Sequence, residues 1–593
     1  MDEALKHILT NLTITAVAGL YHTDLKGIVL SFQETRKEFK GDITLVTFPL
    51  VAISNKSPEQ TAREIGEYLE QHVEEVSSFE VVKGFLNIRM SDTYWLACLH
   101  ELSEEKAYGR HSRNGKKIMV EYSSPNTNKP LHLGHVRNNV LGFSLSEILD
   151  AAGYEVFKTC LVNDRGIHIC KSMIAWKKYG NDETPESAGL KGDHLVGKYY
   201  VIFDQEYKKE IASLVATGST EEEAKKTAPL ILETQALLLA WEAHNPEVLA
   251  LWKRMNAWVY AGFEQTYSRL GVTFDKYYYE SDTYKLGKDL IQQGLDSNVF
   301  FRKPDGSVWI DLSTDGLDEK VVLRADGTSV YITQDLGTAV LKEADFGMDQ
   351  SIYVVGNEQD YHFKVLFLIL KKLGLPWANG LLHMSYGMVD LPGGKMKSRE
   401  GTVVDADDLI DEMQETARIK TEELGKTDDF SDAEKISLNR KIGLGALKYF
   451  LLKVDPRKRL LFDPAESIDF QGNTGPFIQY SYARIKSILR KESNISRYKG
   501  EFLGMNEDER SLIKLLYSYR ETVHTAAQEF SPAVIAAYLY DLSKSFNRFY
   551  HENQVLKAED EVTRQFRLNL CLQTGLILKS GMTLLGIEVP EKM

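Results

Sequence analysis

The sequence predicts a multidomain α/β protein, in which a parallel sheet with a helical insertion lies between a small α+β domain and an all-α region. The chain has 593 residues, too many for a single hydrophobic core. From Lys117 onward, strand-like and helix-like patterns alternate, as is typical of a parallel sheet. Beyond about residue 440 the apolar residues recur only at helical spacing.

The first domain is expected over residues 1–112. Within it, GDITLVTFPLVAI (41–53) and FEVVKGFLNIRM (79–90) alternate as strands. Between these runs Ser57 is a candidate N-cap followed by a proline, so we expect a helix through residues 62–76.

The parallel-sheet domain is expected over residues 113–390. Its first strand, helix and second strand form one βαβ unit. Charged helical sequence at 181–265 interrupts the alternation and indicates an insertion. A connecting segment is expected at 391–440 and a helical domain at 441–593. The elements expected in the sheet domain are strands at 117–124, 154–164, 352–356 and 382–391 and helices at 134–153, 167–180 and 360–373.

Composition favours a cytoplasmic protein with no membrane segment. The four cysteines are scattered without a CxxC pair, which argues against a disulfide framework or a zinc site. The N-terminus is acidic rather than basic, and no apolar run is long enough to span a bilayer. No feature sets the oligomeric state, and we expect a monomer.

Charge is unevenly distributed along the chain. The net charge of −14 speaks against general nucleic-acid binding, but residues 441–593 carry 22 Lys and Arg against 18 Asp and Glu. A positive surface confined to one domain can steer a polyanion to that domain. Random scatter of charge is the alternative.

The stretch EYSSPNTNKPLHLGH (121–135) joins the first strand of the sheet to its helix. Such a turn places a helix N-terminus, which attracts phosphate, at the carboxyl edge of the sheet. His132 should lie just outside the helix and His135 in its first turn, with Lys129 adding a full charge. Neither GxGxxG nor a P-loop follows. This arrangement suits nucleotidyl transfer from ATP, which needs positioned donors and charge. The alternative is that the histidines serve only as helix caps or surface residues.

A second basic element, GGKMKSREGTVV (393–404), is a glycine-flanked loop that carries Lys395, Lys397 and Arg399. Mobile basic loops of this kind close over phosphates. Taken alone, a solvated basic turn explains the loop equally well.

Together these motifs resemble those of a known family. HLGH resembles the HIGH signature of class I aminoacyl-tRNA synthetases, and KMKSR is similar to their KMSKS loop. The surrounding SSPNxxKPLHxGHxRN resembles the arginyl-tRNA synthetase form. Further stretches resemble that family in the expected order, and they are NDRGIHI, KGDHLVG, YITQDLGTA, NEQDYH, QYSYARI and the terminal LLGIEVPEKM.

The resemblance covers essentially the whole chain and implies an arginine–tRNA ligase. It implies a Rossmann-like catalytic domain, a helical-bundle anticodon-binding domain at the C-terminus and an N-terminal domain that contacts tRNA. The substrates implied are L-arginine, arginine tRNA, and ATP with Mg²⁺ held mainly by its phosphates. Neither a tightly bound cofactor nor a metal site made of protein ligands is expected.

The resemblance also assigns residues to the ligands. Two carboxylates would match the guanidinium of arginine, a tyrosine would pack on its plane, and polar groups would hold the α-amino and carboxylate ends. These arginine-binding residues are Glu121 and Asp335, Tyr331, and Ser123, Asn126 and Gln359. The ATP-binding residues are Pro125, Leu131, His132, Gly134, His135, Met396 and Ser398. The residues that stabilise the transferred phosphate and the leaving pyrophosphate are His132, His135, Lys129, Lys395 and Lys397.

One departure from the class I pattern lies in the loop. The second lysine of KMSKS falls on Ser398, while Lys397 takes the preceding serine position. The resemblance implies that Lys129 is one candidate to replace the missing lysine, and Lys395 and Lys397 are the other lysines that could stabilise the charge.

Contacts to tRNA are expected from two places. In QYSYARIKSILRK, Tyr480, Tyr482 and Arg484 combine rings that could stack on unpaired bases with a cation that could hold phosphate. The alternative is an ordinary amphipathic helix with two core tyrosines. Asn87, in GFLNIRM, is a candidate contact from the N-terminal domain.

Two other functions compete. A small-metabolite nucleotidylyltransferase also uses HxGH at a first βα turn, but it needs neither a basic helical domain nor paired acids. A non-catalytic, synthetase-like RNA-binding protein would be expected to lose the HIGH-like or loop residues, and this chain keeps them.

Overall fold

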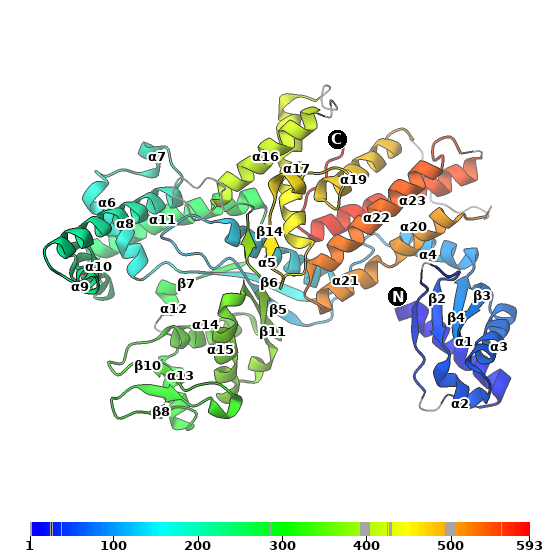
Figure 1. The fold of residues 1–593 in the computed structure, drawn as a ribbon, viewed down its shortest axis with the longest axis horizontal. Coiled ribbons are helices and arrows are strands. Elements are labelled where there is room, and N and C mark those ends of the chain that lie inside the picture. Colours follow the sequence, from blue (N-terminus) through cyan, green and yellow to red (C-terminus); the bar gives the residue numbers. More distant parts are fainter. Residues whose placement is uncertain are drawn as a thin grey trace.

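The computed structural model describes residues 3–23, 25, 28–36, 38–284, 286–391, 404–423, 425, 430–492, 504–558 and 560–593. Figure 1 shows an elongated molecule with a central sheet, a group of helices at one end and the N-terminal domain at the other. The C-terminal helices lie between the sheet and the N-terminal domain.

The N-terminal domain is α+β, as predicted. Its antiparallel sheet has the order β1-β2-β4-β3. Ser57 caps the helix α3 by accepting the backbone N–H of Gln60. The elements are α1 (Glu3–Tyr21), β1 (Phe32–Glu34), β2 (Ile43–Val46), α2 (Val51–Ser54), α3 (Pro58–His72), β3 (Val76–Val82), β4 (Phe85–Met90) and α4 (Asp92–Glu104).

Three local predictions in this domain were only partly right. The strand expected at 41–53 ends at Val46, because the chain then turns through a 3-10 helix into α2. The run at 79–90 belongs to two strands, since Lys83 and Gly84 both have positive φ (50° and 80°) and form a tight hairpin turn. The helix α3 stops at His72, so residues 73–76 lead into β3 instead.

The central sheet is parallel throughout, with the order β12-β11-β5-β6-β7. The predicted βαβ unit is confirmed. The chain leaves β5 on one side to reach β6, whereas β11 pairs on the other, so the carboxyl end of β5 is a topological switch point where ligands bind in such sheets. The elements are β5 (Lys117–Glu121), α5 (Leu133–Ala151), β6 (Glu155–Val162), α6 (Ile167–Tyr179), β7 (Lys276–Tyr279), β11 (Gln350–Gly356), α15 (Asp360–Lys372) and β12 (Leu381–Tyr386).

The insertion between α6 and β7 is helical, as predicted. Its last helix ends at Gly271, which adopts the left-handed conformation with φ 63°. The insertion helices are α7 (Pro185–Ala188), α8 (Gly192–Ala216), α9 (Glu221–Thr227), α10 (Pro229–Glu242) and α11 (Pro246–Leu270).

A second excursion, between β7 and β11, was not predicted. It holds a small antiparallel sheet, and its hydrophobic core is shared with β11, α15 and the start of β12. Its elements are α12 (Glu280–Thr283), α13 (Lys288–Asp296), β8 (Phe301–Arg302), β9 (Val308–Ile310), β10 (Lys320–Leu323) and α14 (Tyr331–Phe346).

Among its described residues, the C-terminal region is helical apart from one short strand. The short strand β14 (Leu460–Leu461) pairs with β13 (Val389–Asp390) of the sheet domain. The boundary expected at 441 falls inside α17, because that helix begins at Asp432. The helices are α16 (Ala406–Glu423), α17 (Asp432–Leu452), α18 (Pro464–Ser467), α19 (Gly475–Leu489), α20 (Glu507–Tyr517), α21 (Tyr519–Gln528), α22 (Pro532–Glu552) and α23 (Glu561–Leu584).

The helical region docks on both other domains. The Ser144 hydroxyl on α5 donates to the Leu584 carbonyl at the end of α23, 2.8 Å away, within the core. On the other side, Arg510 of α20 donates to the Met90 carbonyl of the N-terminal domain at 3.1 Å. Within the described part of the chain, no helix has the length and apolar character needed to cross a membrane.

Candidate functional site

The HLGH turn lies at the carboxyl edge of the sheet, where β5 feeds α5. His132 is the N-cap of α5, and its Nδ1 accepts the N–H of Gly134 at 3.1 Å. His135, in the first turn, accepts the N–H of His132 on its own Nδ1 at 3.2 Å. The predicted positions of both histidines are confirmed. They also cap the helix, so the capping interpretation and a functional one are compatible.

These two hydrogen bonds determine the protonation of the imidazoles. An Nδ1 that accepts an N–H carries no proton, so the ring proton sits on Nε2. Burial lowers the pKa of His132 to about 4 and that of His135 well below its ordinary value, with the nearby Lys129 lowering both further. At neutral pH the histidines are therefore neutral Nε2–H donors, and the positive charge at this turn comes from the half-buried Lys129.

Gly134 lies directly against the ring of His132. A Cβ at this position would lie 2.9 Å from Cε1 of His132, so any side chain would displace the imidazole. Pro125 and Leu131, assigned to ATP by resemblance, are both buried.

The segment that follows the basic loop returns to the HLGH turn. The N–H of Leu133 donates to the Val404 carbonyl at 2.9 Å, and the N–H of Ala406 donates to the Leu131 carbonyl at 3.0 Å. The end of the loop is therefore fixed beside the histidines. The predicted loop residues Lys395, Met396, Lys397 and Ser398 lie outside the described residues.

A strained corner separates β5 from the turn. Ser123 and Ser124 both have positive φ, 81° and 45°, which costs about 1–3 kcal/mol per residue and typically marks functional sites. Ser123 is buried, and its hydroxyl bonds the hydroxyl of Tyr267 at 2.7 Å. Asn126, by contrast, is exposed.

Acidic residues gather where β7 ends and where α14 and α15 begin. Tyr331 and Asp335 lie one turn apart on α14, which confirms that this segment is helical. Tyr331 is 77% exposed, and Gln359 is also exposed. Oδ2 of Asp335 lies 2.7 Å from Nε2 of His362 on α15.

Glu121, the other predicted arginine ligand, is engaged within the protein. Its carboxylate forms an ion pair and hydrogen bond with the ammonium of Lys342 on α14, and both side chains are buried. This ion pair lies in the interior of the protein and not at its surface.

Sequence reasoning missed Glu280 and His362. Glu280 begins α12, and burial raises the pKa of its carboxyl to about 7, with Asp164 and Asp335 raising it further against the opposing effect of Arg165. Its place directly after a parallel strand was the available signal. His362 belongs to NEQDYH, one of the family-like stretches, but nothing local indicated its contact with Asp335.

Among the described residues one group, His194, Asp405 and Asp407, has metal-like spacing. Asp407 already pairs with Lys191 and Arg269, so its charge is compensated by the protein. This cluster therefore does not fit a Mg²⁺ site, and it instead joins the insertion to the end of the basic loop.

Of the predicted tRNA-binding residues of α19, two line a cavity and one is buried. Tyr480 and Arg484 line a cavity of about 340 Å³ together with Lys592 and Met593, and the Arg484 guanidinium lies 4.8 Å from the Tyr480 ring centre. Tyr482 is 3% exposed and donates to Glu591 at 3.0 Å. Its ring therefore packs in the core, as the alternative interpretation had it.

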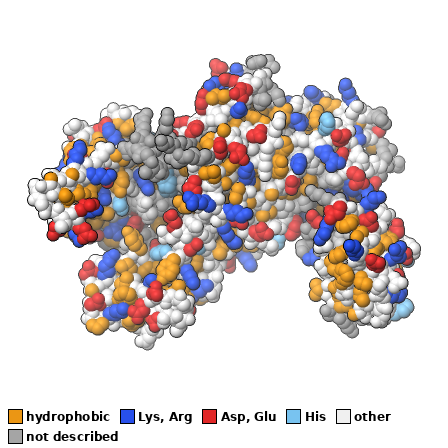
Figure 2. Space-filling view, viewed as in Figure 1, with side chains coloured by type: hydrophobic (Ala, Val, Ile, Leu, Met, Phe, Trp, Pro, Cys, Tyr) orange, Lys and Arg blue, Asp and Glu red, His pale blue; other side chains and the backbone are white. Residues whose placement is uncertain are grey.

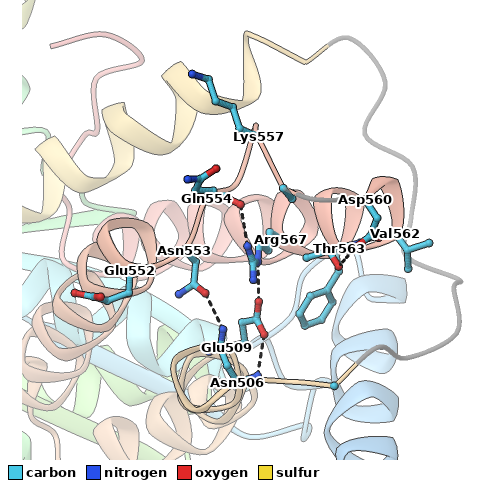
Figure 3. Close-up of a pocket in the computed structure, with 13 residues that line it drawn as sticks. Asn506, Glu509, Glu552, Asn553, Gln554, Lys557, Asp560, Val562, Thr563 and Arg567 are labelled. Carbon is cyan, nitrogen blue, oxygen red and sulfur yellow. Dashed lines mark hydrogen bonds and ion pairs between the residues drawn. The ribbon is translucent and has the colours of Figure 1, made fainter.

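The surface charge is mixed, and the helical domain has a second cavity. On the face shown in Figure 2, Lys and Arg side chains are interspersed with Asp and Glu. A larger polar cavity of about 510 Å³ lies near the start of α23, where Arg567 bonds Glu509 and Asn506 bonds Asn553 (Figure 3). The cavity is lined by the acids Glu509, Glu552 and Asp560 as well as by Lys557 and Arg567, so it does not present a single charge to a ligand.

Asn87 lies within the N-terminal sheet rather than on its surface. It is 2% exposed, and its Oδ1 accepts the Thr44 hydroxyl at 2.6 Å. Among the described residues its Nδ2 has no hydrogen-bond partner. The position does not expose the amide to an RNA.

Comparisons with known proteins agree along the whole chain. Residues 98–463 match the family model described as tRNA synthetases class I (R), catalytic domain. Residues 2–90 match the arginyl tRNA synthetase N terminal domain, and residues 478–593 match the DALR anticodon binding domain.

Individual relatives also match over nearly the whole length of the chain. The chain is 54% identical to an arginine–tRNA ligase from Bacteroides thetaiotaomicron, with 98% of each chain covered, and 55% identical to one from Flavobacterium psychrophilum, with 100% of each covered. The structure of Thermus thermophilus arginyl-tRNA synthetase superposes with a TM-score of 0.78 at 27% identity, covering 99% of this chain and 100% of that one.

Proposed function

The chain belongs to the arginyl-tRNA synthetases of class I, and we propose that it joins L-arginine to the 3′ end of arginine tRNA through an arginyl-adenylate. In the first step the arginine carboxylate attacks the α-phosphate of ATP and pyrophosphate leaves. The observation that carries the proposal at the site is the pairing of Leu131 and Leu133 with residues 404–406, which brings the end of the basic loop to the two histidines. Neither competing function is supported by the comparisons.

At the ATP end, His132 and His135 donate from Nε2 to phosphate oxygens, while Lys129 supplies charge. Neutral donors that are already oriented stabilise a phosphate transition state without a reorganisation cost. Lys395 and Lys397 are proposed to stabilise the leaving pyrophosphate, with Met396 and Ser398 completing the ATP contacts. Mg²⁺ would arrive with ATP, held by its phosphates.

At the arginine end, Asp335 is proposed to pair with the guanidinium and Tyr331 to pack on its plane. Both residues lie on one face of α14, and the exposed Tyr331 ring is available to a ligand. Glu280 adds a second carboxyl near Asp335. Ser123, Asn126 and Gln359 are proposed to hold the α-amino and carboxylate groups.

At the tRNA end, the cavity beside Tyr480 and Arg484 is proposed to accept an unpaired base of the anticodon arm. A half-buried ring next to a guanidinium offers stacking and phosphate contact together. Tyr482 would support this cavity by holding Glu591 near the C-terminus. Asn87 would have to be uncovered to touch RNA, so we propose it only as a support for the surface around it.

The test is arginine-dependent exchange of pyrophosphate into ATP, measured with and without arginine tRNA. We expect exchange only when arginine and tRNA are both present, because the resemblance implies a tRNA-dependent activation step. Exchange with another amino acid, or with none, would overturn the proposal. Esterification of tRNA with labelled arginine tests the second step separately.

A further inference from the structure

The segment at residues 404–407 lies between the HLGH turn and the helical insertion. Two backbone hydrogen bonds, described above, join this segment to Leu131 and Leu133. Asp405 lies opposite His132, with which it forms an antiparallel bridge. The backbone on both sides of His132 is therefore paired with this segment, and its position depends on what holds the segment in place.

Asp405 is held by a histidine of the insertion. Nε2 of His194, in the first turn of α8, lies 3.0 Å from Oδ2 of Asp405. Oδ1 of Asp405 accepts the N–H groups of Asp407 at 2.8 Å and Asp408 at 3.2 Å, so the same carboxylate caps α16. Burial disfavours the charge on both partners, but their hydrogen bond and mutual attraction leave the pKa of His194 raised and that of Asp405 lowered. The contact is therefore a charge-assisted hydrogen bond.

Asp407 is held by three further groups of the insertion. The hydroxyl of Thr266 donates to its Oδ2 at 3.0 Å, and Nη1 of Arg269 donates to its Oδ1 at 2.9 Å. The ammonium of Lys191, the N-cap residue of α8, bonds the same carboxylate. The Asp407 side chain is 11% exposed, so these bonds are largely screened from water and fix the start of α16 against α8 and α11.

The insertion also contacts the chain that enters the HLGH turn. Tyr267 follows Thr266 on α11, and its hydroxyl bonds that of Ser123 at 2.7 Å, at the strained corner after β5. The strand that leads into the turn and the segment that pairs with the turn are thus both set against the insertion.

We propose that the helical insertion positions the HLGH histidines, with His194, Lys191 and Arg269 as positioning residues for adenylate formation. They hold Asp405 and Asp407, and through them the backbone that pairs with the turn at His132. Groups that stabilise a transition state must stay within about 0.5 Å of their productive place, which a surface turn alone does not ensure. The inference rests on the proposed role of the histidines at the ATP phosphates.

Substitutions of His194 can separate its hydrogen bond from its presence in the fold. His194→Ala removes the bond to Asp405, whereas His194→Gln keeps an N–H donor at the place of Nε2. Lys198→Met is the matched control. Lys198 lies one turn further along α8 and pairs with Glu183 at 2.7 Å, within the insertion and away from the 404–407 segment.

We expect His194→Ala to lower the kcat of arginine-dependent pyrophosphate exchange roughly tenfold or more, because a misplacement of about 1 Å at catalytic groups can cost about a hundredfold. The KM for arginine should stay within about twofold of the wild type, since transition-state groups are affected and ground-state binding is not. His194→Gln should recover kcat to within about threefold, because it restores the donor. Lys198→Met should match the wild type.

A double-mutant cycle shows whether His194 acts through His132. In a His132→Asn enzyme, adding His194→Ala should lower kcat by no more than about threefold, because two residues that act on one group are not additive. The same loss in both backgrounds would show that His194 acts elsewhere, and the inference would be overturned.

Three other results overturn it as well. These are a wild-type kcat in His194→Ala, a His194→Gln variant as slow as His194→Ala, and a raised KM for arginine at unchanged kcat. If His194→Ala does not fold, as judged by circular dichroism and melting, Arg269→Met and Arg269→Lys replace the two variants, since the Arg269 side chain is 32% exposed. Failure of the proposed function would be visible separately, as wild-type protein that performs no arginine-dependent exchange.

Discussion

Asp335 of α14 and His362 of α15 meet across the proposed arginine site, with Nε2 of the imidazole 2.7 Å from Oδ2 of the carboxylate. The contact orients a carboxylate that is about one-third exposed. An acid held in one orientation can pair with a planar guanidinium at a lower entropy cost than a freely rotating one.

Asp335→Asn should weaken arginine binding while the fold is retained. A hydrogen bond to a charged group contributes about 1.5–3 kcal/mol, so the KM for arginine should rise roughly ten- to a hundredfold. His362→Gln, which keeps a donor near the carboxylate, is the control and should change the KM less. An Asp335→Asn enzyme with wild-type KM would remove this residue from the site.

Glu280 should make arginine affinity depend on pH near neutrality. Its pKa is raised to about 7, chiefly by burial, so the carboxyl is neutral below that pH and negative above it. Arginine stays cationic throughout, and the ionised fraction of Glu280 rises about tenfold between pH 6 and 8. The KM for arginine should therefore fall by up to about tenfold over this range. In Glu280→Gln the dependence should vanish, and persistence of the same profile would assign it to another group.

His132→Asn and His132→Ala separate capping from chemistry. Asparagine is a good N-cap, so His132→Asn should melt like the wild type but lose the Nε2–H donor, whereas alanine should also lose roughly 0.5–2 kcal/mol of stability. Both should slow adenylate formation by about 10²–10³, the typical effect of removing one transition-state donor. Affinity for tRNA should be unchanged, and loss of tRNA binding with normal exchange would show that the turn does not serve ATP.

The low pKa of His132 predicts how the rate of adenylate formation depends on pH. Because burial lowers the pKa of His132 to about 4, the ring stays neutral as the pH falls through 6.5. The rate of adenylate formation at saturating arginine should therefore show no histidine-like midpoint near 6.5. A midpoint there that disappears in His132→Asn would contradict the protonation state inferred from the hydrogen bonds.

Tyr480→Ala should weaken tRNA binding, whereas Tyr482→Ala should lower the stability of the protein. Loss of a stacking ring costs about 1–3 kcal/mol of affinity, so Tyr480→Ala should bind arginine tRNA less tightly and melt normally. Tyr482→Ala removes a buried ring and should destabilise the protein by about 3–5 kcal/mol. Equilibrium tRNA binding and thermal melting of both variants check this, with Tyr482→Phe as the control that removes only the bond to Glu591. Equal loss of affinity without loss of stability in both would return Tyr482 to a base-stacking role.

Features that depend on neighbouring residues could be predicted from the sequence. Caps, glycine stops and hydrophobic period located α5, α6, α15 and the long C-terminal helices, and the βαβ unit followed from them. The positions of His132 and His135 relative to α5 were predictable for the same reason, since a helix start is a local event. The pairing of Tyr331 with Asp335 on one helical face was also local.

Features that depend on residues far apart in the chain became visible only in the folded protein. The hairpin turn at Lys83 and the small sheet β8–β10 were not predicted, because short strands have only a weak periodic pattern in the sequence. Asn87 and Tyr482 looked available in the sequence, but packing against β2 and the C-terminal segment encloses them. The partner of Glu121 is 221 residues away, and no local pattern indicates which cation will meet a buried acid. A buried carboxylate has lost its hydration, so it is stable only beside a positively charged group that the fold places next to it.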